Sequence, residues 1–412
     1  MNDIRKKRRY INYLTCVFLL VYGMKALDGG CLTYLSEELM TSLRCTTAQY
    51  SSLSSLYYLT YSLSCMLVGM LTSRMARRKI LLAPMTLATG VISLATTQVN
   101  SFTGLALCRF LTGFFQGGSF SLMLSILSKN LVVNDYGRRN GIINMGSSVI
   151  STLAGPVLFS YMALHYAWNT AYYLTGPVLI ALSLVICFTV DEVKVEVQKK
   201  AADRGAWQQN VRECIHSHVF LMCLGIGVLE TLSNLCVGVF APLYYTDVMG
   251  YDTLTKAAFL SAKGLCTLPL MLIVPALADR FSVRKVMTVT FSLAFLAPFV
   301  TAVLPGTAFS AVVLAALGAV GGATVSLFTY MIPRNALPER LHGMANGVIL
   351  GVSCLIGGTI APVVLGLLVE IGWPIPSVLG ICALTYLFCV VLSVFLKVRP
   401  YDASQDARQA AA

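Results

Sequence analysis

The sequence predicts an all-α membrane protein in which twelve transmembrane helices form two pseudo-symmetric six-helix bundles. Three observations predict this fold: twelve apolar stretches, the placement of the basic residues between them, and a repeat that relates the two halves. Of the 412 residues, 57% are hydrophobic and 12% are charged, and the mean hydropathy is +0.74. This composition is far more apolar than that of a soluble globular protein.

The apolar stretches have the length that a helix needs to cross a bilayer, about 20 residues. The first six belong to an N-terminal bundle, residues 1–190, and the last six to a C-terminal bundle, residues 218–397. The polar connector 191–217 is either an amphipathic helix on the inner membrane face or a solvated tether, and residues 398–412 form a polar tail. The expected spans are residues 11–35, 48–72, 80–99, 103–128, 140–164, 170–190, 218–245, 256–278, 286–304, 308–333, 344–370 and 375–397.

The basic residues gather on one side of this arrangement. With the N-terminus in the cytoplasm, 25 of the 30 Lys and Arg residues fall in inner segments. Only Arg44 and Lys256 fall in outer loops, and Lys25, Arg109 and Lys263 fall inside spans. Because cationic residues of short loops collect on the cytoplasmic side, both termini are expected inside. The formal net charge of +12 therefore reflects topology, and we expect no nucleic-acid partner.

The two halves share short motifs at a constant spacing. Residues 69–79 align with residues 275–285, and residues 137–143 align with residues 343–349, both at an offset of 206. Two separate motifs at one offset indicate an internal duplication. Parallel six-helix repeats around a site at the bilayer midplane are typical of one large class of secondary transporters.

The two basic loops, 69–79 and 275–285, resemble the major facilitator superfamily signature Gly-x-x-x-Asp-Arg-x-Gly-Arg-Arg. The first copy has Ser73 in place of the acidic residue, and the second has Pro275 in place of the leading glycine. The resemblance implies a transporter that works by alternating access, with charge contacts at an inner gate. The residues that this resemblance assigns to the gate are Gly69, Arg74, Arg78, Asp279, Arg280 and Arg284.

A narrower resemblance comes from spans 1 and 4. Asp28 in span 1 and Arg109-x-x-x-Gly113-x-x-Gln116 in span 4 resemble the Asp and Arg-x-x-x-Gly-x-x-Glu pattern of anion:cation symporters, which include proton-driven sugar-acid importers. The resemblance implies an anionic substrate. Gln116 stands where the pattern has a titratable Glu, and Gly29 stands where many members have an Arg.

Charged residues inside the spans are the candidate site. Each costs about 2.5 to 3.5 kcal/mol on insertion scales, so such residues face a cavity or pair with one another. Lys25 and Asp28 share a helix face with Tyr22, where they are either functional or a structural ion pair. We expect Asp28 and Glu230 to be the proton-coupling residues. The residues expected to bind substrate are Tyr22, Lys25, Arg109, Gln116, Asn144, Glu230, Asn234 and Lys263.

These features predict a secondary active transporter of a small organic anion, a monocarboxylate or a sugar acid, by proton symport. The cations in the spans outnumber the carboxylates, which suits an anionic substrate. Two alternatives stay open: a proton-coupled exporter of drugs or metabolites, and a non-transporting membrane sensor. The sequence has no nucleophile, phosphate-loop or metal motif, so we expect neither an enzyme nor a cofactor. We expect a monomer in the cell membrane, a bacterial inner membrane, with lipid, protons and a small molecule as its partners.

Overall fold

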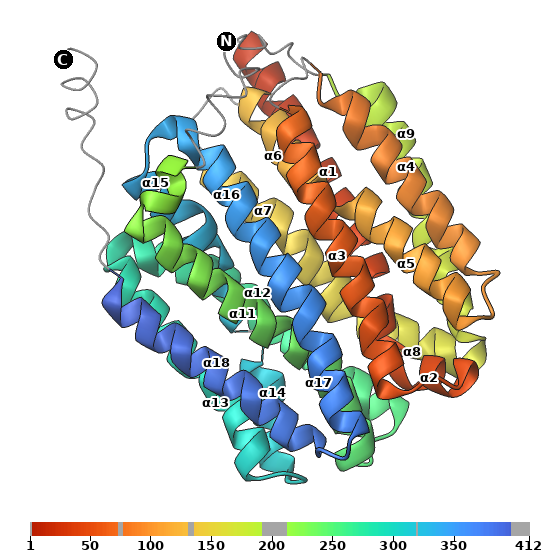
Figure 1. The fold of residues 1–412 in the computed structure, drawn as a ribbon. Helices are drawn as coiled ribbons and strands as arrows, with labels where there is room; N and C mark the ends of the chain where they lie inside the picture. The colour runs from red at the N-terminus through yellow and green to blue at the C-terminus, as the bar shows by residue number, and fades with distance from the viewer. Residues whose placement is uncertain (1, 73–76, 131–135, 192–211, 319, 397–412) are drawn as a thin grey trace.

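The computed structural model describes residues 2–72, 77–130, 136–191, 212–318 and 320–396, and within these ranges it contains helices and no strand. Long helices run side by side, with those of the first half gathered on one side and those of the second half on the other (Figure 1). The predicted all-helical fold with two bundles is confirmed.

In the described ranges, the N-terminal bundle contains six membrane-spanning units. Each unit, here called a rod, consists of one helix or of consecutive helical segments. The fourth rod is broken between α5 and α6, and the fifth contains a π-helical segment, η1. Its elements are α1 (Asn2–Tyr34), α2 (Ser36–Leu43), α3 (Thr47–Thr72), α4 (Lys79–Thr96), α5 (Phe102–Gln116), α6 (Ser119–Asn130), α7 (Tyr136–Gly146), η1 (Ser147–Ala154), α8 (Gly155–His165), η2 (Trp168–Ala171) and α9 (Tyr172–Thr189).

The C-terminal bundle repeats this plan, with interruptions again in its fourth and fifth rods. Its elements are α11 (His218–Leu243), η4 (Tyr244–Val248), α12 (Thr253–Arg280), α13 (Val283–Val303), α14 (Ala308–Leu317), η5 (Gly321–Thr324), η6 (Leu327–Met331), α15 (Ile332–Ala336), α16 (Glu339–Ser353), η7 (Cys354–Ile360), α17 (Ala361–Glu370) and α18 (Ile375–Phe395).

Eleven helices of the described ranges are long and apolar enough to cross a membrane. The remaining rod is α3, which has 26 residues and carries many Ser, Thr and Tyr side chains. Those hydroxyls lower its hydropathy. We therefore take α3 as the twelfth span, in agreement with the twelve expected from the sequence.

Most predicted ends lie within a few residues of the observed ones, but two features differ. Helix α1 begins at Asn2, well before the expected start at residue 11. The loop after it contains the short helix α2, with Glu37 and Glu38 in its first turn. The helix dipole stabilises carboxylates at this position. The expected connector and tail fall largely or wholly in residues 192–211 and 397–412, outside the described ranges.

The break in the fourth rod follows from two consecutive glycines. Gly118 has φ +69°, a conformation that an L side chain rarely adopts. A Cβ on Gly118 would also lie 2.5 Å from Cβ of Val68 in α3. The break ends α5 at Gln116 and starts α6 at Ser119, which exposes the last carbonyl groups of α5 to neighbouring side chains.

A second glycine sets the distance between α3 and α5. A Cβ on Gly113 would lie 2.2 Å from the carbonyl oxygen of Tyr57 and 2.3 Å from Oγ1 of Thr60. The two backbones therefore touch in the part of α5 from which the side chains of Arg109 and Gln116 project.

Replacing Gly113 with Ala is expected to destabilise the protein by about 1 to 3 kcal/mol, because the added methyl group meets backbone that cannot move aside. The midpoint of thermal unfolding in detergent measures this change. Gly347→Ala is the matched control: Gly347 is also helical, and its Cβ would meet nothing within 4 Å, so the midpoint should not fall. Equal midpoints for the two variants would contradict the close packing of α3 and α5.

The two bundles touch along two seams. Gly264 of α12 lies against η1, where a Cβ would be 2.6 Å from the carbonyl carbon of Thr152. Gly366 of α17 lies against α3, where a Cβ would be 2.7 Å from Oγ of Ser51. These seams border the space between the bundles in which the candidate site lies.

Candidate substrate cavity

A cavity of about 360 Å³ lies between the bundles. Its polar and charged wall comes from the N-terminal bundle, whereas the C-terminal bundle contributes small and apolar groups. The lining residues are Tyr22, Lys25, Ala26, Gly29, Gly30, Leu32, Thr33, Ser54, Tyr57, Tyr58, Tyr61, Arg109, Gln116, Ser119, Phe120 and Ser151 from the first half, and Leu235, Gly238, Val239, Leu350 and Cys354 from the second.

Lys25 is held at the break between α5 and α6. Its ammonium group donates a hydrogen bond to Oγ of Ser119 (2.7 Å) and a longer one to the carbonyl oxygen of Phe115 (3.4 Å). The side chain is 3% exposed. A cation at the C-terminal end of a helix is stabilised by the free carbonyl groups and the helix dipole, so the glycine break creates the place that Lys25 occupies.

Arg109 is anchored by neutral groups. It donates hydrogen bonds to the carbonyl oxygen of Gly29 (3.1 Å) and to the hydroxyl of Tyr172 in α9 (2.6 Å). Its guanidinium carbon lies 5.9 Å from the centre of the Tyr172 ring, within the range of a cation–π contact. These contacts leave further N–H donors of the guanidinium for a ligand.

Asp28 does not pair with Lys25. Its carboxylate accepts hydrogen bonds from Ser93 (2.7 Å) and Thr175 (2.9 Å) on one oxygen and from Nε2 of Gln116 (3.0 Å) on the other. It is 1% exposed. Four helices, α1, α4, α5 and α9, thus meet at one buried, fully hydrogen-bonded carboxylate, and the ion pair considered from the sequence does not form.

A hydrogen-bond chain connects Asp28 with the cavity. Gln116 donates to Asp28, and its amide oxygen accepts a hydrogen bond from the hydroxyl of Tyr57 (2.7 Å). Tyr57 packs edge to face with Tyr58, with 5.0 Å between ring centres. One wall of the cavity is therefore formed by three tyrosines of α3, Tyr57, Tyr58 and Tyr61.

The cavity brings together part of the set expected from the sequence. Tyr22, Lys25, Arg109 and Gln116 line it, and Asp28 is bonded to Gln116. Four other expected residues are not among the lining residues, and their roles in substrate binding stay predictions; these are Asn144, Glu230, Asn234 and Lys263.

Two features of the site are not expected from the sequence, the three tyrosines of α3 and Ser119. The Tyr57-Tyr58-x-x-Tyr61 spacing is the signal that could have indicated the tyrosines, because it places them on adjoining helix faces. Nothing in the sequence indicates Ser119, since its position depends on the break at Gly117–Gly118.

Glu230 is buried within the C-terminal bundle and is not a lining residue of the cavity. Its carboxyl group is 1% exposed, and Thr231 donates a weak hydrogen bond to Oε2 (3.5 Å). Oε1 has no hydrogen-bond partner within the described ranges, and the same holds for the buried hydroxyls of Ser353 and Tyr386. The helices α11, α16 and α18 thus each place an unpaired polar atom in the interior of the C-terminal bundle.

Close backbone approaches position these hydroxyls. A Cβ on Gly227, one turn before Glu230, would lie 2.6 Å from Oγ of Ser353, and a Cβ on Gly321 would lie 2.6 Å from the hydroxyl of Tyr386. Among the described lysines and arginines, none forms an ion pair with Glu230.

The gate residues expected from the family resemblance are described in part. Arg78 donates a hydrogen bond to the carbonyl oxygen of Ser125 in α6 (3.1 Å). Arg280 and Arg284 are exposed at the junction of α12 and α13. Gly69 and Asp279 belong to α3 and α12, and Arg74 lies outside the described ranges. The gate role of this set stays a prediction.

Comparison with known proteins gives concordant results. Residues 16–362 match the family model described as Major Facilitator Superfamily. Multidrug resistance protein MdtL of Klebsiella pneumoniae subsp. pneumoniae is 23% identical over 354 residues, which cover 84% of this chain and 86% of that protein. Sialic acid transporter NanX of Escherichia coli is 22% identical over 358 residues, 84% of each chain.

A similar solved structure is that of a variant of the nucleoside transporter NupG. It superposes on this chain with a TM-score of 0.74 at 14% sequence identity, covering 93% of this chain and 99% of that one. At this identity the superposition shows a shared fold. The family match covers well over half of the sequence.

Proposed function

Because this chain belongs to the Major Facilitator Superfamily of membrane transporters, we propose that it carries a small organic anion, a monocarboxylate or a sugar acid, together with a proton by symport. Membership makes it a multi-pass membrane protein that handles a small molecule, and not an enzyme. The substrate class, the proton and the direction are the proposal.

The observation that carries the proposal is an uncompensated positive charge at the cavity. Two cations, Lys25 and Arg109, are accompanied at the cavity by one carboxylate, Asp28. Neither cation forms an ion pair with any described carboxylate. Buried charge without a partner is costly. A substrate carboxylate would supply the missing negative charge and would gain charge-assisted hydrogen bonds from both cations.

The size and asymmetry of the cavity support a small, amphiphilic anion. Its volume of about 360 Å³ lies at the lower end of the range for ligand pockets, about 300 to 1,000 Å³. The carboxylate would bind the N-terminal wall at Lys25 and Arg109. The remainder of the substrate would face tyrosine rings and the apolar groups of the C-terminal bundle.

Of the two acids expected to carry the proton, we assign that role to Glu230. Asp28 receives three hydrogen bonds that favour its ionised form, so we propose that it is a permanent counter-charge. Glu230 has a bare oxygen and no cationic partner, and protonation would remove the cost of an unpaired buried charge. Its proton would then be released when a conformational change brings water to the carboxyl group.

A ligand panel measured by thermal unfolding tests the substrate class. Monocarboxylates, sugar acids and dicarboxylates are compared with neutral sugars and lipophilic cations on the purified protein. A ligand at 100 times its Kd stabilises the native state by about 2.7 kcal/mol, so at least one anion should raise the midpoint by several degrees. Stabilisation by cations alone would contradict the proposal.

The second candidate function is export of drugs or metabolites by proton antiport. It is favoured by the similarity to a protein named for multidrug resistance, and by Gln116, which cannot carry a proton. The cation arm of the ligand panel tests this candidate. The antiport function would be favoured if lipophilic cations bind saturably and if their binding weakens when the protein is protonated.

A further inference from the structure

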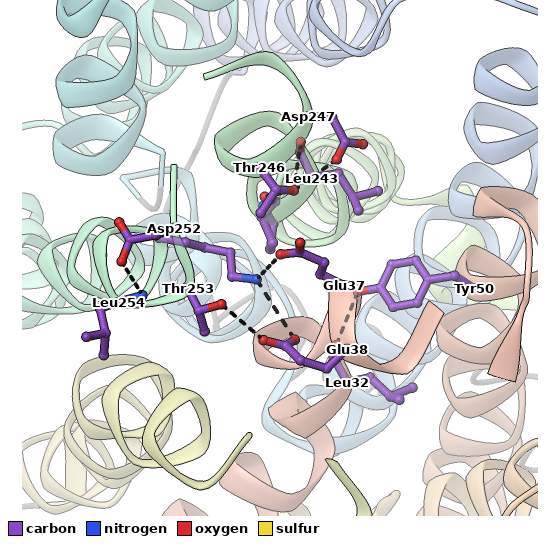
Figure 2. A network of polar contacts seen from close by, with 12 residues as sticks. Leu32, Glu37, Glu38, Tyr50, Leu243, Thr246, Asp247, Asp252, Thr253 and Leu254 are labelled. Atoms are coloured by element: carbon purple, nitrogen blue, oxygen red, sulfur yellow. Dashed lines mark hydrogen bonds and ion pairs between the residues drawn. The ribbon is translucent and has the colours of Figure 1, made fainter. Parts of the chain in front are cut away.

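One ion-pair cluster joins the two bundles at the end of the molecule that carries α2. Nζ of Lys256, in α12, lies 3.2 Å from Oε2 of Glu37 and 3.9 Å from Oε2 of Glu38. Figure 2 shows both carboxylates approached from the opposite bundle, with Thr253 beside Glu38. The acids and the lysine are more than 210 residues apart in the sequence.

The local structure of both helices fixes this contact. The side chain of Asp252 caps α12 by accepting a hydrogen bond from the amide of Leu254 (3.3 Å), and a hydrogen bond from Thr255 lowers the pKa of Asp252. Lys256 follows one turn later. Thr253 donates a hydrogen bond to Oε1 of Glu38 (3.5 Å). The first turn of α12 therefore presents a donor pair to the acidic first turn of α2.

Exposure differs strongly across the pair. The Lys256 side chain is 0% exposed, whereas Glu37 is 52% and Glu38 is 22% exposed. A fully buried ammonium group depends on its carboxylate partners, because losing them leaves an unpaired charge in a dry place. If the bundles separate at this end, water reaches all three groups and replaces the contacts. The cluster therefore stabilises the closed arrangement, and its opening costs little free energy because water replaces the lost contacts.

We propose that Glu37, Glu38 and Lys256 form an outer latch, a reversible contact that closes the substrate cavity on the side opposite the N-terminus and opens whenever the transporter exposes the cavity to that side. With the termini in the cytoplasm, this side faces outward. The proposal requires that the protein alternates between two accessible states, and it is independent of which substrate or ion is carried.

Native cysteines allow the latch to be tested without substrate. Cys354 lines the cavity, and Cys223 is fully buried within the C-terminal bundle; both are free. A membrane-impermeant maleimide is added to right-side-out and to inside-out vesicles, and labelling of each cysteine is followed by peptide mass spectrometry. Cys354 reports cavity access, and Cys223 reports unfolding.

K256E should open the latch by repulsion, so Cys354 should be labelled at least severalfold faster from outside and more slowly from inside. The triple variant E37K/E38K/K256E restores opposite charges and should return both rates toward wild type. R44E makes the same charge change on an exposed residue at the same end and should leave both rates unchanged.

An unchanged Cys354 rate in K256E would overturn the latch, as would failure of the triple variant to reverse an increase. A faster rate from the cytoplasmic side would overturn its assignment to the outside. If K256E also exposes Cys223, the comparison moves to K256Q, which removes the attraction without repulsion. A smaller increase from outside is expected there, and no increase would again overturn the proposal.

Discussion

Arg109→Met is expected to weaken substrate binding by at least about 150-fold and to abolish uptake. Charged hydrogen bonds contribute about 1.5 to 3 kcal/mol each, and two such bonds to a substrate carboxylate would be lost. The methionine keeps much of the side-chain volume but removes every donor. Binding of the anion identified in the ligand panel, measured by calorimetry, gives the affinity, and filter uptake gives the transport rate.

Two further variants separate the charge of Arg109 from its shape. Arg109→Lys keeps the charge and loses the planar fork, so its affinity should fall between those of wild type and Arg109→Met. Arg44→Met changes an exposed arginine at the end of α2 and should bind normally. If a well-folded Arg109→Met protein binds the anion with wild-type affinity, Arg109 has no part in substrate binding.

Glu230→Gln is expected to abolish proton-driven accumulation while preserving exchange of substrate across the membrane. The amide mimics the protonated acid, so substrate binding continues, but no proton can be gained or lost. With one proton per anion, a gradient of one pH unit supports about tenfold accumulation. Wild-type accumulation should rise as the outer pH falls, and in the variant the ratio of inside to outside substrate should stay near one at every pH.

Glu370→Gln provides the matched control, since Glu370 is an exposed acid at the end of α17 and its variant should accumulate substrate normally. Asp28→Asn distinguishes the role of Asp28 in proton coupling from that of Glu230. It removes charge from a site with three hydrogen bonds and should lower the unfolding midpoint. If Asp28→Asn loses coupling with exchange intact while Glu230→Gln stays coupled, the assignment of the proton to Glu230 is wrong.

The fold could be predicted from the sequence because a bilayer imposes simple rules. Span length, the placement of Lys and Arg, and the repeat at an offset of 206 each constrain the same twelve helices. The break at Gly117–Gly118 could not be predicted, because glycine in a membrane helix serves close packing as readily as a break. The positive φ of Gly118 (+69°) distinguishes the two.

Three charged residues that the sequence indicates, Lys25, Asp28 and Arg109, do lie at the cavity, but their partners could not be predicted. Lys25 and Asp28 are spaced for a pair on one helix face, yet hydroxyls from α4 and α9 satisfy Asp28 and the end of α5 satisfies Lys25. From the sequence, Lys256 is only an outer-loop cation. Its pairing with α2 depends on how the bundles meet, which no local pattern contains.

The central claim is that an anion and a proton cross the membrane together, and proton flux in sealed proteoliposomes measures this most directly. The vesicles contain a pH-sensitive dye, and carboxylates and sugar acids are added outside with no imposed gradient. We expect at least one anion to acidify the interior with wild-type protein and not with Arg109→Met. Silence across the anions, with lipophilic cations releasing an imposed proton gradient, would contradict symport and establish the exporter.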